Sequence, residues 1–163
     1  MTHVAEREIA DVYLKLREQA LSFGEVEIKA PPVVPGGRAL GVIMDLGYDT
    51  AVVSVMGLAD GTTSMYVSNG GGKIGMGDHS SVALASKRWV EVAETASPVT
   101  ETDGDELPLD GTVRFNILTT GPRLFAEARE SELGFESHPL HRLYTAGQAV
   151  VTAMRLVDEA GPG

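Results

Sequence analysis

Residues 66–79 read YVSNGGGKIGMGDH, and this stretch decides how the chain folds. Five of the eight residues at positions 70–77 are glycine, and they separate a strand-like segment from an amphipathic one. Backbone with so few side chains must turn sharply, admit a close neighbour, or do both. The stretch therefore predicts a tight connection from a strand to a helix.

Three β-rich segments precede the glycines, at residues 39–46, 51–56 and 62–68. Short connections with the composition of hairpin turns join them, and the pair Asp60-Gly61 is the stronger turn signal. This spacing predicts an antiparallel meander. Because the first two strands are nearly apolar on both faces, we expect them in the centre of the sheet.

A helix and a second hairpin are predicted after the glycines. Asp78 stands where an N-cap belongs, and apolar residues recur at helical spacing on Val82, Ala85, Trp89, Val92 and Ala96. Trp89 is therefore a predicted core residue. Two predicted strands, 112–119 and 123–130, flank the turn Thr120-Gly121-Pro122. Apolar and polar residues alternate along this hairpin, so one of its faces is expected to contact solvent. Arg114 and Arg123 are interpreted as solvated.

An amphipathic helix is predicted at each end of the chain. The first covers residues 4–23, with a stripe of Ala5, Ile9, Val12, Leu16 and Ala20. The last opens at Pro139 and places these residues in the core: Leu140, Leu143, Gly147, Val150, Val151, Met154 and Val157. The order α-βββ-α-ββ-α predicts an α+β fold with three helices on a single antiparallel sheet of about five strands. This order is similar to that of profilin-like and roadblock-type domains, a likeness of topology that implies no function.

The chain of 163 residues is long enough for one domain with its own core, and we assign residues 1–163 to it. Three segments read as irregular: a Pro/Gly linker at 30–38, an acidic, solvated loop at 97–111, and a flexible tail at 159–163.

Composition excludes several classes of function. The chain has no cysteine, so disulfides and thiolate chemistry are out of reach. Its net charge of −10 argues against nucleic acid or an anionic membrane as partner, whereas a basic protein remains possible. The charged start does not resemble a signal peptide, and no apolar run approaches the roughly 20 residues that span a bilayer. We therefore expect a cytoplasmic protein.

The glycine-rich stretch has two explanations. Its amides, followed by a helix, could cradle a small anion. Ile74 after Lys73 breaks the Walker pattern, and the glycine spacing of a dinucleotide site falls here after a meander. The other explanation is a tight connection whose glycines adopt positive φ. The candidate residues for binding a ligand or partner are Tyr66, Ser68, Asn69, Gly70, Gly71, Gly72, Lys73 and His79.

Catalytic and metal-binding patterns are incomplete. His79 follows Asp78 and precedes two serines, but neighbours on a helix point about 100° apart, and a triad would need partners that the sequence does not identify. His138 and His141 with Glu136 could form part of a zinc site, yet the ligand count is short. We assign no catalytic residue, no metal and no cofactor.

Two functions follow as expectations. The first is a non-enzymatic domain that acts through a protein partner or as a homo-oligomer. An acidic protein that neutralises a basic toxin is one form of it. The alternative is a small-molecule or anion-binding protein, with enzyme activity left open, that uses residues 69–79.

Overall fold

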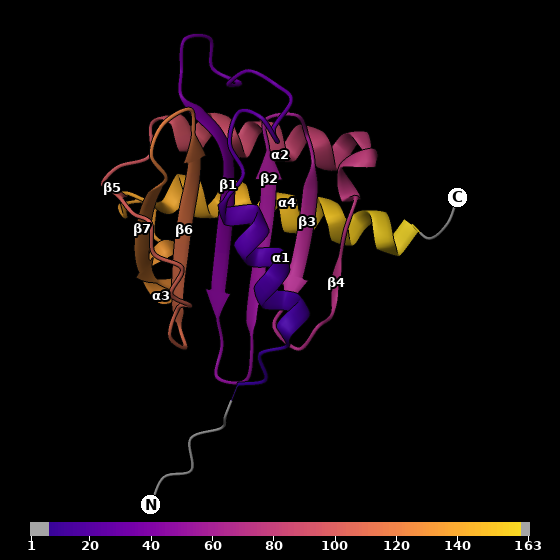
Figure 1. Cartoon of the computed structure of the whole chain (residues 1–163). Coiled ribbons are helices and arrows are strands. Elements are labelled where there is room, and N and C mark those ends of the chain that lie inside the picture. Colours follow the sequence, from indigo (N-terminus) through magenta and orange to yellow (C-terminus); the bar gives the residue numbers. More distant parts are fainter. Residues whose placement is uncertain (1–6, 161–163) are drawn as a thin grey trace, which may run out of the picture.

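The computed structural model describes residues 7–160, in which helices lie on both faces of one seven-stranded sheet (Figure 1). The strand order is β4-β3-β2-β1-β6-β7-β5, and every pairing is antiparallel. The strands are β1 (Ala39–Gly47), β2 (Val52–Leu58), β3 (Thr63–Val67), β4 (Gly72–Lys73), β5 (Thr100–Glu101), β6 (Thr112–Thr119) and β7 (Leu124–Arg129). The helices are α1 (Asp11–Leu21), α2 (Ser80–Glu94), α3 (Glu130–Leu133) and α4 (His141–Ala160), and η1 (Met76–Asp78) is a 3₁₀ turn.

The predicted α+β class with a single antiparallel sheet is confirmed. β1, β2 and β3 form the expected meander, and β6 and β7 form the expected second hairpin. β1 is central, and all nine of its residues are buried, as its apolar sequence predicted. The sheet exceeds the predicted five strands because β4 and β5 each add two residues at its edges. Strands this short leave no periodic pattern in a sequence.

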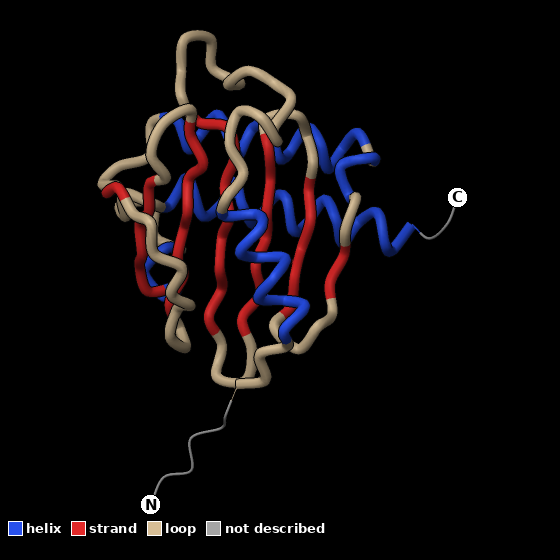
Figure 2. The backbone as a smooth tube through the Cα atoms, in the orientation of Figure 1, coloured by secondary structure: helices blue, strands red, loops and turns tan. Residues whose placement is uncertain are grey.

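The helices form two separate layers. α2 and α4 lie side by side on one face of the sheet, and α1 crosses the other face (Figures 1 and 2). Gly147 of α4 approaches Met44 of β1, whereas the next residue of that strand, Asp45, pairs with Arg17 of α1. Because successive strand residues point to opposite faces, β1 gives one face to the apolar core and the other to polar contacts.

The first helix is shorter than predicted. It begins at Asp11 rather than at Val4, which lies outside the described residues together with Ala5. The residues just before it are held by long-range bonds instead of helical ones, since the Ala10 amide donates to the Ser68 carbonyl at 2.7 Å. The buried face is also different and consists of Tyr13, Arg17, Ala20 and Leu21. Val12, predicted to be buried, is 52% exposed.

The start of α2 corrects a second prediction. Asp78 is not the N-cap, because η1 contains it and His79 occupies the N-cap position. Val82 and Trp89 are buried as predicted, and Trp89 has an exposed fraction of 0%. The remaining buried residues of the helix are Ser86, Val90 and Ala93. The inward face therefore lies about one residue off the predicted stripe, because the helix packs against both the sheet and α4.

The C-terminal helix follows the predicted pattern closely. Leu143, Gly147, Val150 and Met154 are its buried residues. It begins at His141 rather than at Pro139, and the short helix α3 precedes it. Residues 159 and 160, predicted to be part of a flexible tail, belong to α4, and 161–163 lie outside the described residues. Within residues 7–160, we find no helix with the length and apolar character needed to cross a bilayer.

Candidate functional site

The glycine-rich stretch forms a hairpin, a 3₁₀ turn and the entry to α2. β3 pairs with β4, so that Tyr66 lies opposite Gly72. Gly70, Gly72 and Gly75 have positive φ values of 101°, 153° and 74°. A Cβ at Gly72 would collide with the Met65 carbonyl oxygen, and one at Gly77 would collide with the Gly61 carbonyl oxygen. Both requirements that glycine can meet, a left-handed turn and a close backbone neighbour, therefore occur here.

The predicted ligand residues of this hairpin have partners within the protein. The buried Ser68 hydroxyl accepts the Val52 amide at 2.9 Å, and Asn69 Oδ1 accepts the Gly71 amide at 2.9 Å. Lys73 Nζ pairs with Asp158 of α4 at 2.6 Å. His79 is exposed beyond η1, at the start of α2.

The hairpin does not bring all of its candidates together. Tyr66 and Gly72 form one cross-strand pair, and Met65 and Lys73 form the next. Adjacent pairs point to opposite faces, so Tyr66 faces the α1 side and Lys73 faces the α4 side. Ligand binding by residues 69–79 stays a prediction, with Gly70 and Gly71 at the exposed tip.

We expect Gly77→Ala to lower the free energy of unfolding by about 1–3 kcal/mol, as overpacking does elsewhere. The added Cβ meets the Gly61 backbone, which cannot rotate away as a side chain could. Gly134→Ala is the matched control because a Cβ there has open space. Urea unfolding measures both variants, and equal midpoints would contradict the backbone contact as the reason for Gly77.

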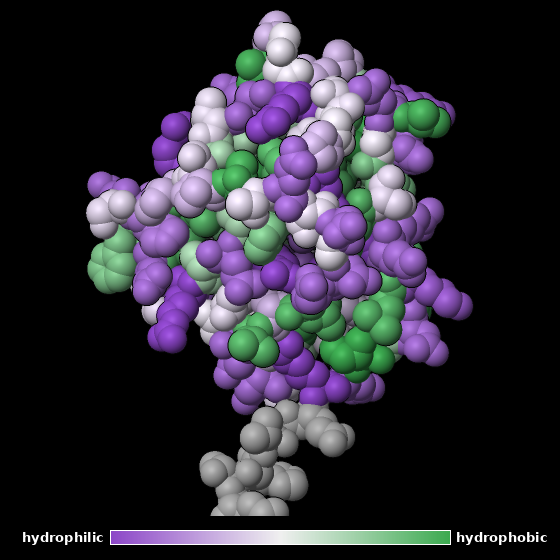
Figure 3. Space-filling view, turned by 60° about the vertical axis from the view of Figure 1, so that its left-hand side comes forward, coloured by the Kyte–Doolittle hydropathy of each residue, from purple (hydrophilic) through white to green (hydrophobic). Residues whose placement is uncertain are grey.

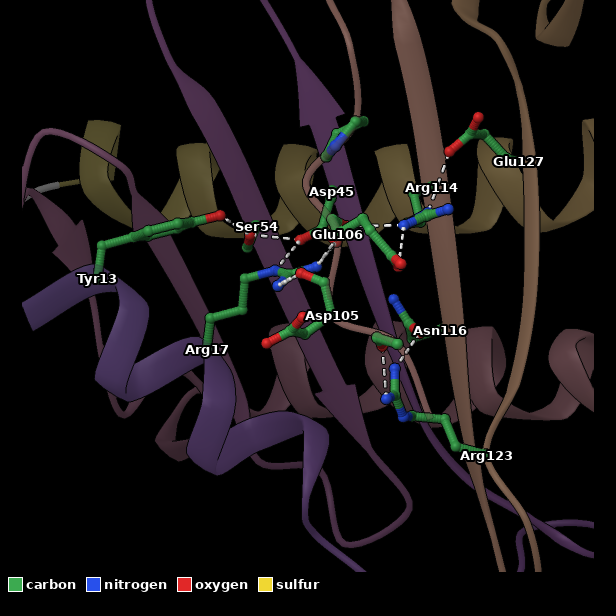
Figure 4. A network of polar contacts seen from close by, with 12 residues as sticks. Tyr13, Arg17, Asp45, Ser54, Asp105, Glu106, Arg114, Asn116, Arg123 and Glu127 are labelled. Carbon is green, nitrogen blue, oxygen red and sulfur yellow. Dashed lines mark hydrogen bonds and ion pairs between the residues drawn. The ribbon is translucent and has the colours of Figure 1, made fainter. Parts of the chain in front are cut away.

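A buried polar network occupies the α1 face of the sheet (Figure 4). Arg17 of α1 pairs with Asp45 of β1, with 2.8 Å between Nη2 and Oδ2. The other carboxylate oxygen of Asp45 accepts from Ser54, whose hydroxyl shares a hydrogen bond of 2.7 Å with Tyr13. Asp45 and Ser54 are 0% exposed, Tyr13 1% and Arg17 3%. The chain of groups is hydroxyl, hydroxyl, carboxylate and guanidinium, and it is closed to solvent.

Residues 102–111, which we call the strap, lie across the same face beside α1. Four arginines donate to its main-chain carbonyls: Arg123 to Gly104 at 2.7 Å, Arg17 to Asp105 at 2.6 Å, Arg114 to Glu106 at 2.9 Å and Arg7 to Pro108 at 2.6 Å. Backbone bonds fix the two ends, since Thr102 donates to Arg123 and Gly111 donates to Gly47. The strap is thus held by its backbone, and the side chains of Asp103, Asp105, Leu109 and Asp110 remain exposed, whereas Leu107 and Pro108 pack inward.

The structure corrects the solvated roles predicted for Arg114 and Arg123. The Arg114 side chain is 15% exposed, pairs with Glu106 at 3.2 Å and with Glu127 at 3.0 Å, and lies 4.8 Å from the centre of the Phe125 ring. Arg123 donates to Asn116 Oδ1 as well as to the strap. The strap was predicted to be an acidic, solvated loop, and most of its residues are exposed. The arginines bound to its carbonyls were not predicted, because main-chain acceptors leave no mark in a sequence.

Burial and charge set the electrostatics of this face. Burial lowers the pKa of Arg17, but its hydrogen bond to Asp45 and the charge of that carboxylate outweigh burial, so the pKa lies above its usual value. Burial, followed by repulsion from Arg17, lowers the pKa of Arg123. Burial, followed by the charge of Asp45, raises the pKa of Tyr13 to about 12. The network therefore holds Tyr13 neutral and Arg17 charged.

We expect alkaline pH to destabilise the protein through Tyr13. The folded pKa lies above the unfolded value of about 10, so the contribution of Tyr13 is complete below pH ~10 and is lost as pH rises toward about 12. A shift of this size corresponds to about 2–3 kcal/mol. Urea midpoints across this range should fall less steeply for Tyr13→Phe than for the wild type, and parallel curves would contradict the assignment.

The two histidines considered for zinc take part in the connection before α4. His138 Nδ1 accepts the Leu140 amide at 3.0 Å, and His141 Nδ1 lies 2.7 Å from the Leu133 carbonyl oxygen. Over residues 7–160, no three histidine or acidic residues are placed to hold a metal ion together.

The arrangement on the α1 face suits a structural role better than chemistry. To take part in a reaction, the hydroxyls of Tyr13 and Ser54 would have to reach a substrate. Both residues are buried, with exposed fractions of 1% and 0%, so a substrate cannot reach them in this structure. What the network does is hold α1 and the strap on the sheet. The network was not predicted from the sequence, although the charged Asp45 in an otherwise apolar strand was a usable signal, because a buried carboxylate requires a partner. Comparison of the chain with protein family models, with curated proteins and with solved structures finds no match.

Proposed function

We propose that this protein is a non-enzymatic domain that binds a basic protein through the surface formed by the strap and α1. The observation that carries the proposal is the way the strap is held. Its carbonyls bind four arginines from beneath, while the carboxylates of Asp103, Asp105 and Asp110 lie on exposed residues. An extended segment fixed along its backbone presents these charges at little further cost in entropy when a partner binds.

The exposed charged side chains of the strap are all acidic, while the four arginines beneath it are directed at its carbonyls. The sequence has no lysine or arginine between Arg88 and Arg114, a span that contains all the acidic residues of the strap. The opposite layer is balanced: α2 carries Lys87, Arg88, Glu91 and Glu94, and α4 carries Arg142, Arg155, Asp158 and Glu159. A row of exposed carboxylates attracts and orients a positively charged protein.

Apolar side chains are exposed on the same side. Val12 and Leu14 of α1 are 52% and 42% exposed, Val26 after α1 is 84% exposed, and Leu109 of the strap is 77% exposed. Figure 3, which turns the β5–β6–β7 side toward the viewer, shows hydrophobic groups at separate places on a mostly hydrophilic surface. Apolar contacts of this kind contribute to binding affinity, while charges orient the partner and raise the association rate.

A second copy of the chain is a poor occupant of this surface. Two acidic faces would repel each other, and the repulsion would not be relieved without a basic partner. The short edge strands β4 and β5, of two residues each, also offer little template for pairing sheets. The proposal is therefore for a different, basic protein.

The test compares two triple variants that each remove three negative charges. The strap variant is Asp103→Asn, Asp105→Asn and Asp110→Asn, and the control is Asp78→Asn, Glu91→Gln and Glu159→Gln on the helix side. A partner captured from the native host, then purified, should bind the strap variant at least about tenfold more weakly at low salt, with the control unchanged. Equal binding by both variants, or a partner without a basic surface, would overturn the proposal.

A further inference from the structure

A cavity of about 680 Å³ lies where the strap ends. It is lined by Leu109, Asp110, Gly111, Thr112, Arg129, Glu130 and Ser131, which come from the end of the strap, the start of β6 and the junction of β7 with α3. Backbone hydrogen bonds hold the lining segments together. The Gly111 amide donates to the Gly47 carbonyl, and the Glu130 amide donates to the Gly111 carbonyl at 2.9 Å. The cavity is thus continuous with the surface that carries the acidic strap.

The carboxylate of Glu130 is fixed in orientation. The Tyr144 hydroxyl donates to its Oε2 at 2.8 Å and leaves Oε1 for another donor. Glu130 and Tyr144 are both half-buried, so the carboxylate lies in a partly desolvated setting in which charged hydrogen bonds strengthen.

Aromatic and apolar groups accompany that carboxylate. Tyr48 follows Gly47, whose carbonyl binds the strap, and its side chain is 40% exposed. Burial, followed by the charge of Glu130, raises the pKa of Tyr48. Leu109 at the rim is 77% exposed. Neither tyrosine lines the cavity, whose own side chains include the alkyl group of Leu109 and the carboxylates of Asp110 and Glu130. An alkyl group beside carboxylates matches a cationic group that is carried on methylenes.

We propose that this cavity receives an arginine side chain of the basic partner, with its guanidinium on Glu130 and Asp110. The inference rests on the proposed function. Arginine fits better than lysine because its planar guanidinium can donate two parallel hydrogen bonds to a carboxylate. Arg129 also lines the cavity and offsets one of its two negative charges. The lining therefore has two carboxylates, Asp110 and Glu130, and one cation, so that its net charge is negative.

The probe is N-acetyl-L-arginine amide, titrated into the full chain and followed by amide NMR shifts. We expect saturable shifts at residues 109–112 and 129–131, weaker binding of the lysine analogue, and no binding of the glutamine analogue. Glu130→Gln keeps an acceptor for Tyr144 and should weaken arginine binding about tenfold, the value of one charged hydrogen bond. Asp110→Asn, an exposed position, provides a second variant, and Glu136→Gln is the control outside the cavity.

The outcomes separate this inference from the proposed function. Amide shifts that do not saturate would overturn the arginine site. So would equal arginine binding by Glu130→Gln, Asp110→Asn and the control variant Glu136→Gln. If that happens while the strap variant still loses its partner, the proposed function stands without this site. The opposite result is that the wild type binds arginine and the strap variant still captures the partner fully. It would overturn the proposed function but not the arginine site.

Discussion

The variant Arg17→Met should lose about 3–5 kcal/mol of the free energy of unfolding, which is typical when one partner of a buried ion pair is removed. Methionine can fill the space of the side chain, but it leaves the Asp45 carboxylate, 0% exposed, without its cation. The Asp105 carbonyl in the strap loses its donor as well, and the Glu106 carbonyl keeps only its hydrogen bond from Arg114. Urea unfolding at neutral pH measures the loss.

Two controls isolate the cause. Arg155→Met makes the same substitution in an ion pair whose side chains are 59% and 58% exposed, and it should cost less than about 1 kcal/mol. The double variant Arg17→Met with Asp45→Asn removes both charges and should recover much of the loss. An Arg17→Met variant no less stable than Arg155→Met would show that the buried pair does not hold α1 on the sheet.

Local patterns were sufficient to predict the sheet and the helix layer behind it. β-branched runs separated by turn residues, with Asp60-Gly61 as the clearest turn, specify antiparallel neighbours over a few residues of chain. The apolar spacing in α2 and α4 specifies which side of each helix is buried. Errors of about one residue, as at Asp78, arise because a 3₁₀ turn and an N-cap look alike in sequence.

The α1 side could not be predicted in the same way, because its contacts join segments that are far apart in the chain. Tyr13 and Arg17 are four residues apart on one helical face, yet the usual assumption places polar residues outward. Their partners Ser54 and Asp45 lie in separate strands. The strap is harder still, since its binding groups are main-chain carbonyls, which every residue possesses.

The glycines show the same limit. Their density was visible, and it predicted that the backbone turns or approaches something closely. The neighbour of Gly77 is the backbone of Gly61, sixteen residues earlier, and no local rule identifies that pair. A ligand and a neighbouring strand impose the same demand on glycine, so the sequence alone left both explanations open.

Trp89→Ala should lower the free energy of unfolding by about 3–5 kcal/mol, the cost of truncating a large buried aromatic residue. The ring occupies the junction of three elements: a Cβ at Gly57 of β2 or at Gly147 of α4 would lie 2.9 or 3.0 Å from it. Its indole N–H also donates to the Leu143 carbonyl at 3.0 Å. Because Gly57 and Gly147 have no side chain, neither can fill the cavity that removal of the indole would leave.

The comparison with two further variants decides whether packing is the cause. Leu84→Ala, on the same helix at a position 50% exposed, should change stability by less than about 1 kcal/mol. Trp89→Phe keeps an aromatic ring but leaves the Leu143 carbonyl without its donor, so its loss should fall between those of the two alanine variants. If Trp89→Ala unfolds at the same urea concentration as Leu84→Ala, the glycines do not enclose the indole, and the joint between the sheet, α2 and α4 must be held by other contacts.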